Sequence, residues 1–125
     1  MQSANSLALV DTYLDALEAQ DPERIRALLA ESGFSYQSHI ARIDGADDYI
    51  QYLTMTVGIL QRIQRLRVFA DDGDVCHWLQ VETLMSERVS TRMVQWATVL
   101  DGRIIRIEML FDPYRYRMLL EEVTA

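Results

Sequence analysis

The spacing of apolar residues changes near residue 60, and this change is the strongest constraint on the fold. Before it, Leu7, Val10, Leu14 and Leu17 recur at the spacing of an amphipathic helix. After it, apolar and polar side chains begin to alternate, as in a strand that buries one face. A chain with its helices first and its strands afterwards is predicted to fold as an α+β domain.

Turn signals divide the helical part into three predicted helices. Asp21 followed by Pro22 predicts the start of a second helix, because Asp caps helix N-termini and Pro is favoured at the first helical position. Gly33 is well placed to end that helix. An irregular strand over 34–43 and a third helix over 46–60 should follow.

Long strands are predicted in the last part of the chain. Asp101-Gly102 is a strong two-residue hairpin signal, and residues 71–74 and 87–88 mark earlier turns. We therefore expect an antiparallel meander within a single domain over residues 1–125, a length that suits one core. The strands predicted after the first of these turns cover residues 75–85, 89–100 and 103–111.

The composition excludes several kinds of chemistry. Lysine is absent, so Schiff-base catalysis and a P-loop are excluded. The net charge of −7 argues against a nucleic-acid partner, since such binding depends largely on cationic contacts to phosphate. The single Cys76 cannot close an intrachain disulfide, and no metal-ligand spacing or glycine-rich phosphate loop is present. We expect neither a metal nor a cofactor.

The N-terminus carries no targeting signal that we recognise. Residues 1–6 lack the basic region that opens a signal peptide, and no apolar stretch follows them. No segment approaches the roughly 20 apolar residues that a membrane helix needs. The expectation is a cytoplasmic protein without a membrane partner.

Three stretches of the sequence together resemble one known superfamily. They are residues 13–21 (YLDALEAQD) with a short helix ending at 27–29, Gly45 opening the third helix, and residues 101–113 (DGRIIRIEMLFDP). Their order resembles the nuclear transport factor 2-like superfamily, also called SnoaL-like, over roughly residues 7–119. Its members include ketosteroid isomerases, polyketide cyclases, scytalone dehydratase and limonene epoxide hydrolase.

The resemblance implies both an architecture and a range of activities. The fold would be a cone-shaped α+β barrel, with three N-terminal helices on a strongly curved mixed or antiparallel sheet that encloses a pocket. The function would be that of a small cofactor-independent enzyme acting on a hydrophobic, carbonyl-containing molecule, as an isomerase, dehydratase (lyase) or cyclase. The alternative is a non-catalytic module that binds a hydrophobic ligand or dimerises, because fold alone does not fix the reaction.

Three candidate catalytic or binding positions follow from the ketosteroid isomerases. Tyr13 falls where those enzymes have the tyrosine that stabilises an enolate, although a tyrosine there can also simply fill the core. Their aspartate base falls at Tyr36 or Gln37, and neither side chain is a usable carboxylate. His39 lies two residues beyond Gln37, on the same face of a regular strand, and is the candidate base.

Gln95 is the candidate second donor to the oxyanion. Counting back from Asp101-Gly102, it falls where the isomerases have a protonated aspartate, and a glutamine amide can donate the same hydrogen bond. The alternative is that Gln95 is hydrogen-bonded within the core. A slip of one residue would bring Val94 or Trp96 to the inner face instead.

His77 and Asp21 are a further possible catalytic pair. Some dehydratases of this superfamily use a strand histidine oriented by an aspartate near the end of the first helix, and Asp21 resembles that aspartate by position. Asp21 is equally explained as a helix cap. A two-residue turn at 87–88 would pair Gln80 with Gln95 and turn His77 to the outside.

The remaining predicted contacts are apolar. By resemblance, the face of the last strand that carries Ile105 points inward, and residues of the second and third helices lie opposite it. On the outer face, Trp96 with Val94 would form a patch that supports a homodimer. The predicted substrate-binding residues are Leu29, Tyr36, Gln37, Leu53, Val57, Ile107, Met109 and Phe111.

Overall fold

A computed structural model describes residues 2–56, 59–84, 87–112 and 114 of the chain. Three helices precede the long strands, and a pair of short strands lies between the second and third helices. The elements are α1 (Gln2–Glu18), α2 (Pro22–Leu28), β1 (Ser35–Gln37), β2 (Arg42–Asp44), α3 (Ala46–Thr56), β3 (Leu60–Asp71), β4 (Asp74–Leu84), β5 (Arg88–Leu100) and β6 (Arg103–Phe111).

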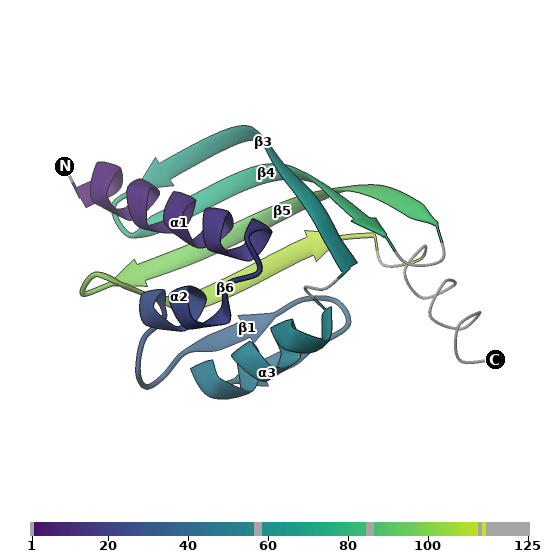
Figure 1. The fold of residues 1–125 in the computed structure, drawn as a ribbon. Coiled ribbons are helices and arrows are strands. Elements are labelled where there is room, and N and C mark those ends of the chain that lie inside the picture. The colour runs from purple at the N-terminus through teal and green to yellow at the C-terminus, as the bar shows by residue number, and fades with distance from the viewer. Residues whose placement is uncertain (1, 57–58, 85–86, 113, 115–125) are drawn as a thin grey trace.

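All strands belong to one six-stranded mixed sheet in the order β2-β1-β6-β5-β4-β3. Only the β1–β6 pair is parallel; the other neighbours are antiparallel. The sheet is curled but not closed, and the helices cover its concave side (Figure 1). The expected α+β architecture is therefore confirmed, as an open cone rather than a closed barrel.

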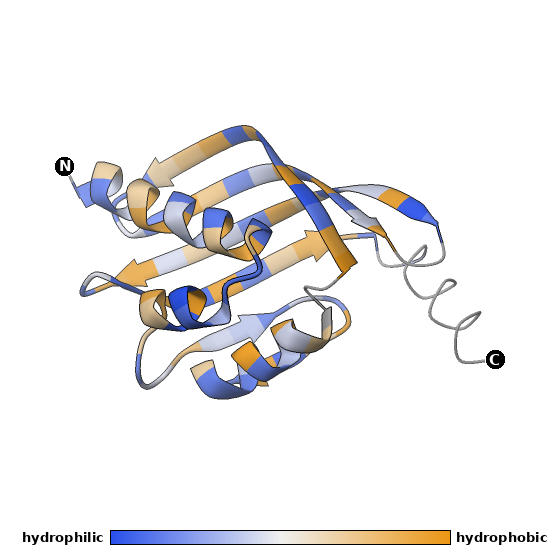
Figure 2. Cartoon of the chain, in the orientation of Figure 1, coloured by the Kyte–Doolittle hydropathy of each residue, from blue (hydrophilic) through white to orange (hydrophobic). Residues whose placement is uncertain are grey.

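The core lies between helix α1 and the concave face of the sheet. Val10, Tyr13, Leu14 and Leu17 are buried on α1, at the helical spacing that the sequence predicted. Bands of polar and apolar residues alternate along this helix (Figure 2), because one side faces solvent and the other packs on the sheet. Within the described residues, no helix is long and apolar enough to cross a membrane.

Helix α2 begins as expected and ends earlier than expected. The Asp21 carboxylate accepts a hydrogen bond from the Arg24 backbone N–H at 3.2 Å, which is the arrangement of a helix N-cap. The helix stops before Leu29, whose backbone is extended and forms a parallel bridge with Ile104. Pairing with the sheet thus ends the helix before Gly33 is reached.

The strand expected over 34–43 is a short hairpin instead. The backbone N–H of Ser38 donates to the carbonyl of Ala41 at 2.8 Å, and this turn separates β1 from β2. His39 therefore lies in the turn and not on a strand face shared with Gln37. Helix α3 ends at Thr56, and Val57 lies outside the described residues.

The pairing of β4 with β5 differs from the predicted register. His77 lies opposite Gln95, and Gln80 lies opposite Arg92. Directly opposed residues share one face of the sheet, so His77 and Gln95 both project inward. The predicted pairing of Gln80 with Gln95 is wrong, because Arg88 is the first residue of β5 and pairs with Leu84, so residues 87–88 do not form a two-residue turn.

A bulge changes which residues of β6 face the core. The register between β5 and β6 shifts next to Val99, which pairs with Ile104, whereas Thr98 pairs with Arg106. Ile104 and Ile107 are buried, whereas Ile105 is only half-buried. The expectation that Ile105 shares the inner face is wrong, because one extra residue resets the alternation and bends the strand.

Candidate functional site: a cavity lined by tyrosines

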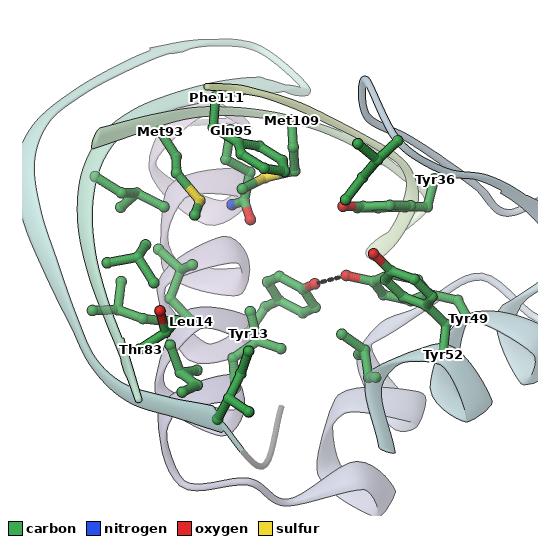
Figure 3. Close-up of a pocket in the computed structure, with 18 of the residues that line it drawn as sticks. Tyr13, Leu14, Tyr36, Tyr49, Tyr52, Thr83, Met93, Gln95, Met109 and Phe111 are labelled. Carbon is green, nitrogen blue, oxygen red and sulfur yellow. Dashed lines mark hydrogen bonds between the residues drawn. The ribbon is translucent and has the colours of Figure 1, made fainter. Parts of the chain in front are cut away.

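A cavity of about 310 Å³ lies between α1, α3 and the concave face of β3–β6. Figure 3 shows tyrosines along one side of it and Gln95 with methionines along another. Its lining is mostly apolar, and every polar lining group is a hydroxyl or an amide. The lining residues are Tyr13, Leu14, Leu17, Tyr36, Ile40, Tyr49, Tyr52, Leu53, Met55, Ile59, Leu60, Ile63, Leu79, Val81, Thr83, Met93, Gln95, Met109 and Phe111.

Four tyrosines from three elements meet at one side of the cavity. The hydroxyls of Tyr13, on α1, and Tyr49, on α3, are hydrogen-bonded to each other, and both side chains are buried. The Tyr36 ring stacks on the Tyr49 ring with ring centroids 4.9 Å apart, and the ring centroids of Tyr36 and Tyr52 are 5.7 Å apart. One hydroxyl of the Tyr13–Tyr49 pair donates to the other, so the accepting hydroxyl keeps its proton for a third group.

Burial keeps these phenols protonated. Desolvation raises the pKa of Tyr13, and it raises that of Tyr49 well above its usual value. Burial, reinforced by the neighbouring Tyr52, raises the pKa of Tyr36 to about 12. At neutral pH the cluster can donate hydrogen bonds and cannot accept a proton as a base.

Two other polar groups face the cavity from the sheet. Gln95 projects from β5 and Thr83 from β4, and both side chains are buried. Neither Gln95 Nε2 nor Thr83 Oγ1 has a hydrogen-bond partner. A buried polar atom without a partner costs free energy, so a ligand group that bonds Thr83 Oγ1 would be favoured.

Behind Gln95, His77 connects the core to a charged cluster at the surface. Its Nε2 lies 3.2 Å from the Asp11 carboxylate of α1. Arg65 on β3 lies 3.9 Å from Asp11 and bonds the Asp15 carboxylate at 2.6 Å. Desolvation lowers the pKa of His77, while Asp11 opposes the shift and Arg65 adds to it. His77 is therefore neutral near pH 7.

Of the predicted catalytic residues, the structure brings Tyr13 and Gln95 to the cavity and leaves His39 outside its lining. His39 is exposed in the β1–β2 turn, and its ring meets the edge of the Phe111 ring with centroids 6.3 Å apart. Ile40 from the same turn does line the cavity. His39 thus lies at the rim, because the strand ends at Gln37.

The predicted substrate-binding residues divide in the same way. Tyr36, Leu53, Met109 and Phe111 line the cavity. Three other predicted residues do not, for separate reasons. Gln37 is exposed, because it follows the buried Tyr36 and points to the opposite face of β1, whereas Leu29 and Ile107 are buried in the core and do not line the cavity.

Asp21 is not the partner of His77. It caps α2, and Asp11, ten residues earlier, bonds the imidazole instead. Sequence reasoning missed Asp11 as well as Tyr49. The available signals were helical spacing, which places Asp11 and Asp15 one turn apart on one side of the helix, and the series Tyr49, Tyr52, Leu53 on one face of α3.

The outer face of the sheet carries an exposed apolar patch. The register places Trp78 opposite Val94, Val94 opposite Leu110, and Trp96 opposite Cys76, so these side chains are neighbours. Trp78 and Trp96 are each about half exposed, and Phe69 continues the patch onto β3. The predicted outward direction of Trp96 agrees with the structure.

The site has no cluster of metal ligands among the described residues, and the chain matches one known domain family. In the described part of the chain, no group of three or more His, Cys, Asp or Glu side chains could hold a metal ion. A model of the SnoaL-like domain matches residues 10–107. The chain belongs to the SnoaL-like domain family. A search of curated proteins finds no match to this SnoaL-like protein.

Solved structures of several activities share this SnoaL-like fold. An LEH-like epoxide hydrolase of M. tuberculosis is 23% identical, with a TM-score of 0.82, over 100% of this chain and 96% of the other. A proposed ketosteroid isomerase from Kribbella flavida DSM 17836 is 28% identical, with a TM-score of 0.77; the match covers 88% of this chain and 79% of the other. A proposed SnoaL-like polyketide cyclase from Jannaschia sp. CCS1 is 16% identical, with a TM-score of 0.81; the match covers 94% of this chain and 92% of the other.

Proposed function

We propose that the cavity binds a neutral, largely apolar small molecule that contains a carbonyl group, and that tyrosine hydroxyls polarise this carbonyl. The observation that carries the proposal is the hydrogen-bonded pair of Tyr13 and Tyr49 within an otherwise apolar cavity. A buried phenol that stays protonated can stabilise negative charge on a carbonyl oxygen without losing its own proton.

In the first form of this proposal, the protein is an enzyme that catalyses a proton shift, dehydration or ring closure of the bound molecule without a cofactor. An imidazole can accept a proton and return it. His39 is the candidate, because it touches Phe111 at the rim and belongs to the same turn as the lining residue Ile40. The imidazole takes a proton from the carbon next to the carbonyl, and the enolate oxygen that forms accepts a hydrogen bond from the tyrosine. In a proton shift, the imidazolium then returns the proton to another carbon of the enolate.

The second use is binding without turnover. A specific observation favours it: the described lining residues include no carboxylate and no imidazole. In the binding role, the tyrosines and Gln95 would only orient the ligand.

Binding is tested with two near-isosteric probes, 2-acetylnaphthalene and 2-isopropenylnaphthalene, by fluorescence titration. We expect the ketone to bind about three- to tenfold more tightly than the alkene, as one hydrogen bond predicts. The double variant Tyr13→Phe/Tyr49→Phe should lose this preference, and exposed Tyr114→Phe should keep it. Equal binding of both probes by the unsubstituted protein would contradict the proposal.

Turnover is tested by following deuterium entry from D₂O into 2-tetralone by mass spectrometry. An enzyme of this kind should exchange the protons next to the carbonyl faster than buffer. The His39→Gln variant should lower the rate by about 10²–10⁴-fold if His39 is the base. Exposed Arg42→Gln in the same hairpin is the matched control. Tight binding without exchange would identify the binding role.

The outer patch supports a homodimer as the partner arrangement. Trp78, Trp96 and Leu110 are neighbouring exposed apolar side chains on three adjacent strands. A contiguous apolar surface of this kind is usually covered by a partner. A second copy of the chain, packed face to face across the same patch, would remove it from water.

A further inference from the structure

Three buried side-chain polar atoms in the described part of the chain have no hydrogen-bond partner: His77 Nδ1, Thr83 Oγ1 and Gln95 Nε2. Two of these atoms belong to residues that lie directly opposite each other, His77 on β4 and Gln95 on β5. Opposed residues of an antiparallel pair share a face, with Cβ atoms about 4.5–5.5 Å apart. The free ring nitrogen and the free amide nitrogen therefore belong to adjoining side chains.

The Asp11 contact fixes the polarity of the His77 ring. A carboxylate can only accept a hydrogen bond, so the Nε2 atom that lies 3.2 Å from Asp11 must carry a proton. In a neutral imidazole the other nitrogen, Nδ1, is then an acceptor. His77 thus presents a lone pair to the interior of the protein.

The polarity of His77 in turn decides how the Gln95 amide is oriented. An amide has a donating end and an accepting end, and hydrogen-bonding partners decide which end points where. The end beside a lone pair is favourable only as NH₂. The carbonyl oxygen of Gln95 then faces the cavity, which agrees with the side chain in Figure 3.

His77 Nδ1 and Gln95 Nε2 are not hydrogen-bonded to each other in the structure. We propose that the Nδ1 lone pair, which the Asp11 contact fixes on the neutral His77 ring, favours the Gln95 amide with its nitrogen toward the ring and its oxygen toward the cavity, so that the site selects a ligand with a hydroxyl or N–H donor at this point. The inference rests on the proposed function and extends it to a ligand class. The ligand carries a carbonyl for the tyrosines and, separately, a donor for Gln95. Gln95 determines specificity, and His77 and Asp11 are positioning residues.

This inference reverses the role predicted from the resemblance. There, Gln95 donates to the same carbonyl oxygen as Tyr13. Here, Gln95 accepts from the ligand, because the His77 lone pair favours the amide orientation that leaves the oxygen toward the cavity. The difference comes from Asp11, which sequence reasoning had not connected to His77.

The ligand preference is tested with 6-acetyl-2-naphthol and 2-acetylnaphthalene, which share the ketone and differ by one hydroxyl. We expect the hydroxylated probe to bind about three- to tenfold more tightly. Gln95→Leu should abolish the difference while the ketone still binds. A hydroxyl that gives no advantage in the unsubstituted protein would overturn the inference.

The positioning role is tested by comparing variants of Asp11. In Asp11→Ala, no acceptor holds the proton on Nε2, so the neutral His77 ring can carry its proton on Nδ1 instead. The Gln95 amide can then turn its oxygen to Nδ1. The preference for the hydroxylated probe should therefore disappear. Asp11→Asn retains an oxygen acceptor and should keep the preference. Asp15→Asn alters the same charged cluster without touching His77 and is the control. A purely structural effect would weaken both probes equally, which would contradict a positioning role.

A measurement without ligand checks the same chain of contacts. The two histidines are distinguished in a ¹⁵N NMR spectrum by the His39→Gln variant. We expect His77 at neutral pH to be protonated at Nε2 and free at Nδ1. The opposite tautomer would overturn the inference. If neither acetyl probe binds, the proposed function fails, and the tautomer still decides how Gln95 is oriented.

Discussion

The pair of Tyr13 and Tyr49 decides what the cavity can offer a ligand. Each hydroxyl is buried and is satisfied by the other, so both are held in place and protonated. Neither residue could do this alone, because a single buried hydroxyl would lack a partner. The site therefore depends on two side chains that lie 36 residues apart in the sequence.

The Tyr13–Tyr49 bond predicts strongly non-additive effects on stability. Tyr13→Phe should lower the free energy of unfolding by about 1–3 kcal/mol, because the Tyr49 hydroxyl loses its partner. Adding Tyr49→Phe should cost little more, or recover part of the loss. Urea unfolding of the four proteins in the cycle measures the coupling. Additive losses would show that the bond contributes nothing.

His77 predicts a loss of stability in mild acid. Burial lowers its pKa in the folded state, against the effect of Asp11, so the unfolded chain binds a proton more readily. The stability contributed by the neutral ring is complete above about pH 6.5 and is lost as the pH falls below that value. The charged groups near His77 are Asp11, Asp15 and Arg65, and their charges also contribute to the stability of this region.

Two variants separate this effect from that of other groups. In His77→Gln, the stability measured by urea unfolding should change less between about pH 6.5 and 5 than in the unsubstituted protein. His39→Gln removes the other, exposed histidine and should leave the pH dependence in place. An unchanged slope in His77→Gln would rule out the buried histidine as its cause.

At the scale of elements, close contacts between turns and strands fix how the long strands pair. Gly73 lies in the turn between β3 and β4, and its carbonyl accepts the Val99 N–H at 2.7 Å. The turn is thereby held against β5. The local geometry of one turn contributes to the packing of three strands.

Gly73→Ala should disrupt this contact. A Cβ at this position would lie 2.4 Å from the Val99 carbonyl oxygen, and backbone must move to relieve the overlap. We expect a loss of about 1–3 kcal/mol, as for other overpacked sites, measured by thermal or urea unfolding. Gly102→Asn is the control, since nothing lies within 4 Å and Asn tolerates its positive φ. Equal stability of both variants would contradict the contact.

At the scale of the molecule, the two faces of the sheet carry different surfaces. The concave face holds the cavity under α1 and α3, and the convex face carries the patch of Phe69, Trp78, Trp96 and Leu110. Because side chains alternate along each strand, one pattern of residues supplies both surfaces.

The outer patch predicts a concentration-dependent dimer in sedimentation velocity. Trp96→Arg should shift the protein to monomer, because it places a charge at the centre of the proposed contact. Leu84→Arg changes an exposed apolar residue at the far end of β4 and should leave the dimer intact. A monomer at all concentrations in the unsubstituted protein would refute a dimer through this face.

The sequence alone determined the three helices, the long strands and their order, but not the hairpin of β1 and β2. The helical spacing of α1, the Asp21 cap and the Asp101-Gly102 hairpin depend on neighbouring residues, so local patterns predicted them correctly. The resemblance, with the residues counted back from Asp101-Gly102, also placed Gln95 correctly on the inner face. These features need little information from distant parts of the chain.

Only the tertiary structure decided the pairings between distant segments. The β4–β5 register, in which Leu84 pairs with Arg88, brought His77 inside, and a bulge moved Ile105 off the inner face. Packing of α1 on β4 selected Asp11 over Asp21 as the partner of His77, and packing of α3 selected Tyr49 for Tyr13. A shift of one residue reverses the direction of every side chain in a strand, and no local pattern specifies such shifts.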